Sequence, residues 1–126
     1  MKEKIHILLV DDEADFLSVT EKRLGRKGYA VQSALSCAAA GKIIDSDWPD
    51  IVVLDVMLPD KNGIEFLKEI KAKRPGLPVL LLSGHASVQS GIQGIEYGAY
   101  DYCLKPVEFD ELVEKIAVAC REAGLS

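Results

Sequence analysis

The sequence predicts an α/β fold in which a parallel β-sheet is covered by helices on both faces. Short apolar runs alternate with helix-like segments along the chain, which is the pattern of repeated βα units. Several runs have no polar interruption, as expected of strands that are buried on both faces. The length of 126 residues fits one domain with its own core, so we expect residues 1–126 to form a single unit without a second domain.

Five segments are predicted as strands, because they are short, apolar and rich in branched or aromatic side chains. Four of them end at polar residues, and the remaining one is weaker and is expected nearer an edge of the sheet. In chain order they cover residues 5–10, 29–34, 51–54, 79–82 and 100–104.

Helices are predicted between these strands and after the last one. Gly28 is suited to end the first helix, and Ser36 and Asn62 are suited to cap the second and third. The fourth has the weakest pattern, since Gly91 and Gly94 lie inside it and each costs about 0.5–1 kcal/mol relative to alanine. We interpret it as either an imperfect helix or a part that moves. The first, fourth and last helices are expected over about residues 14–27, 87–97 and 108–122.

Polar groups follow four of the predicted strands. Asp11 and Asp12 follow the first, Asp55 the third, Ser83 the fourth and Lys105 the last. In open α/β sheets, ligands bind outside the carboxyl ends of the strands, so parallel neighbours would bring these groups to one edge. Carboxylates held close together repel one another, and a divalent cation such as Mg²⁺ removes that conflict. The set therefore predicts a site for a divalent metal and a phosphoryl group.

Each of these residues also has a simpler interpretation. Asp11 or Asp12 could cap the first helix, and Asp55 could begin a turn. Ser83 taken alone is more typical of a helix cap, and Lys105 alone could be a surface lysine before a proline. The combination at one predicted edge favours the functional interpretation.

Composition excludes several classes of function. The formal net charge of −5 disfavours nucleic-acid binding by this chain, and no apolar run approaches the roughly 20 residues of a membrane span. No glycine-rich loop suited to a nucleotide phosphate follows the first strand. Cys37, Cys103 and Cys120 are odd in number and lack metal-ligand spacing, so we expect reduced thiols in a cytoplasmic protein, with Cys103 and Cys120 in the core.

Four motifs in order resemble the receiver domain of two-component response regulators over nearly the whole chain. They are LLVDDE at residues 8–13, LDVMLPDKNG at 54–63, LSGH at 82–85 and GAYDYCLKP at 98–106. The resemblance implies a doubly wound, five-stranded (βα)5 sheet of flavodoxin-like order 2-1-3-4-5.

The resemblance also implies a role for each residue of the site. Asp55 is the phosphoacceptor, and Asp11, Asp12 and Asp55 bind Mg²⁺, or Mn²⁺ in its place, together with the backbone carbonyl of Met57. Ser83 and Lys105 bind the phosphoryl group.

Further positions are implied to act in switching and timing. Ser83 and Tyr102 form the switch, with Tyr102 turning inward on activation. The bond before Pro106 is expected to be cis, and Met57 and His85 are expected to tune the lifetime of the phosphate.

The implied function is a phosphorylation-dependent signalling switch, which is not an enzyme beyond assisting its own phosphorylation and dephosphorylation. The expected partners are a sensor histidine kinase or phosphotransfer protein and a downstream output domain or protein, without direct nucleic-acid or membrane binding. Phosphorylation would change the face formed by residues 87–97, 100–104 and 108–122, which is also compatible with a homodimer.

Three other functions stay open. A phosphatase of the haloacid dehalogenase type also uses an aspartate after a strand, but it needs a second aspartate where this chain has Met57. A flavodoxin-like flavin binder shares the expected fold, although the acidic first loop disfavours a flavin phosphate. A receiver could also act as a binding module without being phosphorylated.

Overall fold

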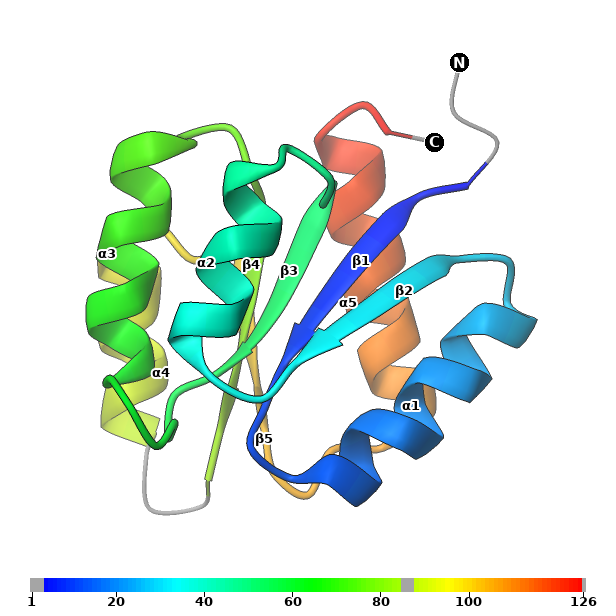
Figure 1. The fold of residues 1–126 in the computed structure, drawn as a ribbon, viewed down its shortest axis with the longest axis horizontal. Coiled ribbons are helices and arrows are strands. Elements are labelled where there is room, and N and C mark those ends of the chain that lie inside the picture. Colours follow the sequence, from blue (N-terminus) through cyan, green and yellow to red (C-terminus); the bar gives the residue numbers. More distant parts are fainter. Residues whose placement is uncertain (1–3, 85–87, 126) are drawn as a thin grey trace.

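The structure is a computed structural model that describes residues 4–84 and 88–125. Five parallel strands form one sheet in the order β2-β1-β3-β4-β5, with a helix after each strand (Figure 1). The predicted fold class and strand order are therefore confirmed. The elements are β1 His6–Val10, α1 Ala14–Arg26, β2 Ala30–Ala34, α2 Cys37–Asp45, β3 Ile51–Asp55, α3 Gly63–Lys73, β4 Val79–Ser83, α4 Val88–Glu96, β5 Asp101–Leu104 and α5 Phe109–Glu122.

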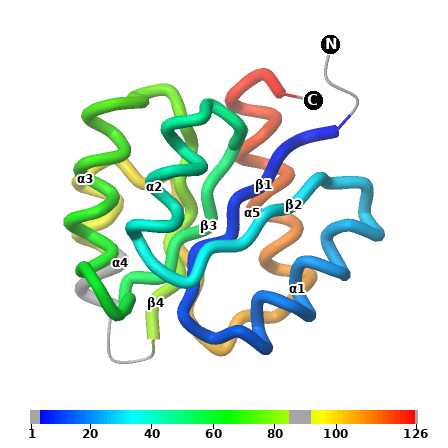
Figure 2. The backbone as a smooth tube through the Cα atoms, viewed as in Figure 1, coloured from blue at the N-terminus to red at the C-terminus, as the bar shows by residue number. Residues whose placement is uncertain are grey.

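Helices cover both faces of the sheet. α1 and α5 lie on one face, and α2, α3 and α4 lie on the other (Figures 1 and 2). Alternating residues of the central strands point into one or the other of two separate apolar clusters. Because β1, β3 and β4 are buried on both faces, their sequences are nearly continuous apolar runs, whereas β2 lies at an edge and is more polar.

The register of the sheet aligns the carboxyl ends of its strands. The pairs that set this register are Val10 with Leu54, Asp55 with Leu82, and Ser83 with Leu104. Asp11 follows β1, Asp55 ends β3, Ser83 ends β4 and Lys105 follows β5, so all four residues lie at one edge. The predicted convergence of polar residues is thus a consequence of parallel pairing.

Local signals end and begin the helices as the sequence predicts. The Ser36 side chain accepts a hydrogen bond from the Ala39 amide at 3.2 Å, and Asn62 accepts one from the Ile64 amide at 2.7 Å. Gly28 follows α1 with φ of 98°, a left-handed conformation that favours glycine. Within the described residues, no helix is long and apolar enough to cross a membrane.

Gly94 has a packing role that the sequence did not predict. A Cβ atom built at Gly94 would lie 2.0 Å from Cδ1 of Leu81 on β4, so the glycine lets α4 approach the sheet closely. Its presence inside the helix is explained by this contact. The contact accounts for one of the two glycines that weaken the pattern of this helix.

The three cysteines are free and buried. Burial raises the pKa of the thiols of Cys37, Cys103 and Cys120 to about 11. Buried neutral thiols behave as small apolar side chains, which agrees with the reduced, core cysteines that the sequence predicts.

The buried thiols predict a loss of stability at alkaline pH. An unfolded thiol ionises near its usual pKa of 9.0, whereas folded Cys103 stays protonated until about pH 11, so stability present below pH 9 is lost as the pH rises toward 11. Each thiol should contribute about 1 kcal/mol to this loss at pH 10. Denaturant unfolding of wild type and Cys103→Ala at pH 8 and pH 10 measures it. Equal losses in both proteins would contradict the prediction.

Candidate metal and anion site

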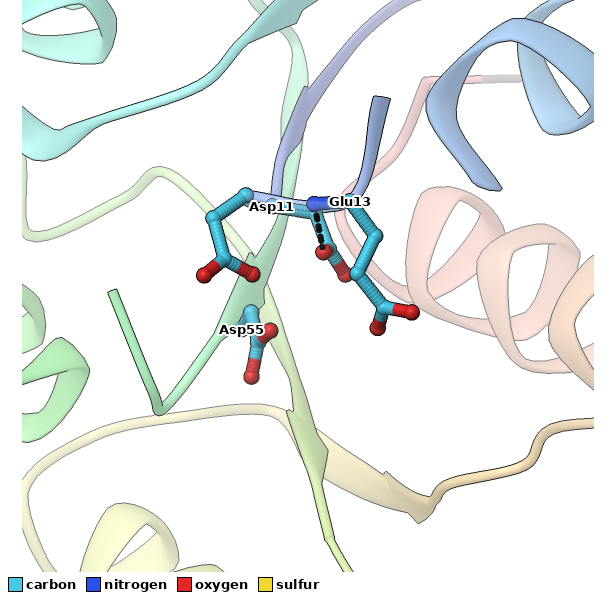
Figure 3. A group of neighbouring side chains, drawn as sticks. Asp11, Glu13 and Asp55 are labelled. Carbon is cyan, nitrogen blue, oxygen red and sulfur yellow. Dashed lines mark hydrogen bonds between the residues drawn. The ribbon is translucent and has the colours of Figure 1, made fainter. Parts of the chain in front are cut away.

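Four carboxylates gather at the carboxyl edge of the sheet. Asp11 and Asp12 follow β1, Glu13 precedes α1 and Asp55 ends β3; one oxygen from each lies within 4.8 Å of the others. Figure 3 shows Asp11, Glu13 and Asp55 grouped at the ends of the two strands. Asp11 and Asp55 are buried, whereas Asp12 and Glu13 are exposed. The group therefore has a fixed inner part and an open outer part.

Backbone amides hold the two buried carboxylates. The Glu13 amide donates to Oδ1 of Asp11 at 2.9 Å, and the Met57 amide donates to Oδ1 of Asp55 at 3.0 Å (Figure 3 shows the first). Both bonds run from a residue two positions later, which is the geometry of an Asx turn. Asp11 thus orients the start of α1 with one oxygen, and its other oxygen, Oδ2, accepts a hydrogen bond from Lys105.

Lys105, which follows the edge strand β5, extends to the acidic residues at the ends of β1 and β3. Its Nζ lies 2.8 Å from Oδ2 of Asp11, 2.7 Å from Oε1 of Glu13 and 3.1 Å from Oδ2 of Asp55. The Lys105 side chain is 18% exposed, and the bond to Pro106 is cis. The lysine that follows β5 therefore contacts residues that follow β1 and end β3.

The pKa shifts follow from these contacts. Burial raises the pKa of Asp55, with a further increase from the charge of Asp11, although the Met57 amide and Lys105 oppose it. Burial alone would lower the pKa of Lys105, but its hydrogen bonds to Asp11 and Glu13 outweigh that effect and raise it. The bond to Lys105 lowers the pKa of Glu13. One cation thus faces several carboxylates, and the excess negative charge favours a bound cation.

Ser83 has a buried hydroxyl without a partner. Its side chain is fully buried, and Oγ makes no hydrogen bond within the described part of the chain. Its carbonyl, in contrast, accepts a hydrogen bond from the Lys105 amide at 2.6 Å. Buried polar atoms are rarely left unpaired, and an unpaired one next to a lysine suits an incoming anion. This observation separates Ser83 from an ordinary helix cap.

The site is open to solvent on one side. A cleft of about 400 Å³ is lined by residues that include Glu13, Phe16, Gly84, Lys105 and Pro106. The Phe16 ring centroid lies 5.3 Å from Nζ of Lys105, within the range of a cation–π contact. A ligand that approached through this cleft would reach the lysine.

The other predicted positions lie around this centre. Met57 follows Asp55 by two residues and is 65% exposed. Tyr102 is half-buried and packs against the apolar cluster beneath α2 and α3. His85 lies outside the described residues. The sequence did not predict the contact of Glu13 with Lys105, although its place beside the acid pair was a usable signal.

The family comparison agrees with this geometry. A family model described as the response regulator receiver domain matches residues 7–117. The chain belongs to this family. Receiver domains are the phosphorylation-dependent signalling elements of two-component systems, so the coarse function predicted from the four motifs is confirmed.

Curated relatives of this receiver domain carry regulatory names. The chain is 34% identical over 122 residues to the probable transcriptional regulatory protein TcrX of Mycobacterium tuberculosis, covering 97% of this chain and 52% of the relative. It is 39% identical over 116 residues to the DNA-binding transcriptional regulator NtrC of Rhizobium meliloti, covering 92% and 24%. The chain thus spans about half the length of the first relative and about a quarter of the second.

Solved structures show the same fold. The receiver domain protein (CheY-like) of Methanospirillum hungatei superposes with a TM-score of 0.91 at 30% identity, covering 96% of this chain and 97% of that one. NtrX from Brucella abortus, solved in complex with ADP, gives a TM-score of 0.91 at 32% identity, covering 97% of this chain and 28% of that one. The likeness extends over nearly all of this chain.

Proposed function

We propose that this receiver is a phosphorylation-dependent switch in which Asp55 accepts a phosphoryl group from a sensor histidine kinase or phosphotransfer protein. The observation that carries the proposal is the pairing of a buried carboxylate with two anion-binding groups. Lys105 contacts Asp55 directly, and the unpartnered hydroxyl of Ser83 ends the neighbouring strand. In this proposal residues 1–126 act as one receiver unit.

The donor set fits a magnesium ion. Mg²⁺ prefers oxygen ligands and is commonly held by one or two carboxylates together with water and phosphate oxygens. The carboxylates of Asp11, Asp12 and Asp55 and the backbone carbonyl of Met57 would hold it, with Mn²⁺ as a substitute. When bound, the ion supplies positive charge that offsets the charge of the phosphoryl oxygens.

The residues of the chain perform the transfer by position and charge. An Asp55 oxygen attacks the phosphorus of a phosphohistidine; the new O–P bond forms as the P–N bond breaks, and the electron pair goes to the imidazole nitrogen. Lys105 stabilises the negative oxygens, as cationic side chains do in phosphoryl transfer generally. The Ser83 hydroxyl donates to one of them and gains the partner that it lacks.

The acyl phosphate would change the surface of the molecule at the β5 edge of the sheet. Phosphoryl binding draws Ser83 and Lys105 inward, and Tyr102, which pairs in register with Leu81 of β4, moves into the space vacated by Ser83. This shifts the balance between two forms of the face made by α4, β5 and α5. That face would control a downstream output domain or protein, or a homodimer.

Phosphorylation at Asp55 can be tested by intact-protein mass. After incubation with acetyl phosphate and Mg²⁺, the wild-type protein should gain one phosphoryl group. The gain should vanish in Asp55→Asn, which keeps the size of the side chain but removes the nucleophilic oxygen, and in wild type treated with a chelator. Folded wild-type protein that gains no mass would overturn the proposal.

Met57 should set the lifetime of the phosphate together with His85. Met57 is exposed two residues from Asp55, so its side chain can shield the acyl phosphate from water. We expect Met57→Ala to shorten the phosphate half-life at least roughly twofold, about 0.4 kcal/mol in the barrier, with little change in stability. The matched control is Leu35→Ala, an exposed side chain after β2. Loss of mass from phosphorylated protein over time gives the half-lives, and equal values would exclude this role.

A further inference from the structure

The loop between β3 and α3 is bonded to a different helix through Asp60. Oδ1 of Asp60 accepts a hydrogen bond from the Cys37 amide at 3.0 Å, and Oδ2 accepts one from the Ala38 amide at 3.0 Å. The next amide of α2, that of Ala39, is bonded to the Ser36 side chain. Two of the first three amides of α2 are therefore capped from outside the helix, by a residue 22 or 23 positions later.

Charge and geometry make this contact specific. A carboxylate at a helix N-terminus meets both unpaired amides and the positive end of the helix dipole. The two amide bonds lower the pKa of Asp60, so it is a carboxylate at neutral pH. The Cys37 thiol adds a long contact of 3.8 Å to the carbonyl of Lys61.

α2 is the fixed partner in this contact. The side chains of Cys37, Ala40 and Ile44 on α2 are at most 4% exposed and belong to the apolar cluster on that face of the sheet. Asp60, in contrast, is exposed and lies in a loop. Because α2 is already held by its packing, the contact fixes the position of the loop and is not required to fix the helix.

The same loop also contacts the phosphoacceptor. The Met57 amide donates to Oδ1 of Asp55 at 3.0 Å, and Met57 pairs across the loop with Asn62 as an isolated β-bridge. The Gly63 amide donates to the Val56 carbonyl at 2.7 Å and closes the base of the loop. Asp60 thus bonds one part of the loop to α2, while the Met57 amide, in the same loop, bonds the Asp55 carboxylate.

We propose that Asp60 is a positioning residue for the Asp55 site. Its bonds to α2 hold the loop of residues 56–62 so that the Met57 amide keeps the Asp55 carboxylate in place and the Met57 carbonyl stays at the metal site. The part that concerns the metal rests on the proposed function, whereas the part that concerns the Met57 amide does not.

A matched pair of variants tests this role. Asp60→Ala and Ser36→Ala each remove a side-chain cap from the same helix, but only Asp60 also belongs to the loop. Asp60→Asn keeps one acceptor and loses the second one and the charge. In wild type and in each variant, NMR measures hydrogen exchange at the Met57 amide, and calorimetry measures the dissociation constant of Mg²⁺.

Positioning predicts different results for the two caps. In Asp60→Ala the Met57 amide should exchange roughly fivefold faster and Mg²⁺ should bind roughly threefold more weakly, as expected from losing partly exposed, charge-assisted bonds. Ser36→Ala should change neither value by as much as about twofold, and Asp60→Asn should be intermediate.

Exchange at Met57 decides the proposal on its own. Equal exchange in Asp60→Ala and Ser36→Ala would overturn it, because Asp60 would then be only a cap of α2. Faster exchange in Asp60→Ala alone would support the positioning role even if wild type failed to bind Mg²⁺, and that failure would count against the proposed metal site.

Discussion

Replacing Lys105 with methionine is expected to lower the free energy of unfolding by about 2–4 kcal/mol without divalent cations, because it leaves buried charges unpaired. Nζ of Lys105 contacts Asp11, Glu13 and Asp55 within 3.1 Å, and Asp11 and Asp55 are almost wholly buried. Methionine keeps a similar apolar stem but removes the ammonium group, with its charge and its hydrogen bonds to the three carboxylates. Mg²⁺ should then restore most of the loss, since the ion replaces the missing cation.

Denaturant unfolding with a chelator and with saturating Mg²⁺ measures both effects. The control is Lys73→Met, whose exposed contact of 3.4 Å with Asp45 should contribute little and should not depend on Mg²⁺. A Lys105→Met protein as stable as wild type in chelator would contradict this role of Lys105. Equal stabilisation of wild type and Lys105→Met by Mg²⁺ would also contradict it.

Gly63→Ala is expected to have the other large effect, a loss of about 3 kcal/mol, which is at the upper end for overpacking. An alanine Cβ at this position would lie 2.4 Å from the Asp55 carbonyl oxygen and 2.6 Å from Cα of Val56. These are backbone atoms at the end of a buried central strand, so neither can move away cheaply. The displacement should also disturb the Asp55 carboxylate, and the variant should accept less phosphate.

Gly41→Ala provides the matched control for this substitution. Gly41 lies within α2, and a Cβ there would meet no atom within 4 Å. Alanine should therefore stabilise the protein by about 0.5–1 kcal/mol through its higher helix propensity. Thermal or denaturant unfolding compares the two variants. Similar stabilities would show that the close approach of Gly63 to β3 is not rigid.

Sequence patterns predicted the sheet because its strands carry the signal themselves. Buried parallel strands are continuous apolar runs, and polar residues at their ends must meet once the strands are parallel neighbours. Asp11, Asp55, Ser83 and Lys105 could therefore be placed at one edge without coordinates. The strand order, in contrast, came from the family resemblance, since apolar runs of similar length do not specify which strand lies next to which.

Contacts between distant segments were not predictable in the same way. In the sequence, Gly63 is only the start of a helix, and Gly94 only weakens one. The structure shows why each lacks a side chain: Gly63 lies close to the backbone at the end of β3, and Gly94 lies close to Leu81. Asp60 appears as an ordinary turn residue, because its partners at Cys37 and Ala38 belong to a helix earlier in the chain. Such roles depend on tertiary proximity, which local periodicity does not encode.

Among three neighbouring aspartates, Asp55 is the one proposed to carry the phosphate. Borohydride reduction of an aspartyl phosphate converts that residue to homoserine, which peptide mass mapping can locate. After treatment with acetyl phosphate and Mg²⁺, homoserine is expected at position 55 only. Homoserine at position 11 or 12, or unmodified aspartate at all three positions in folded protein, would contradict it.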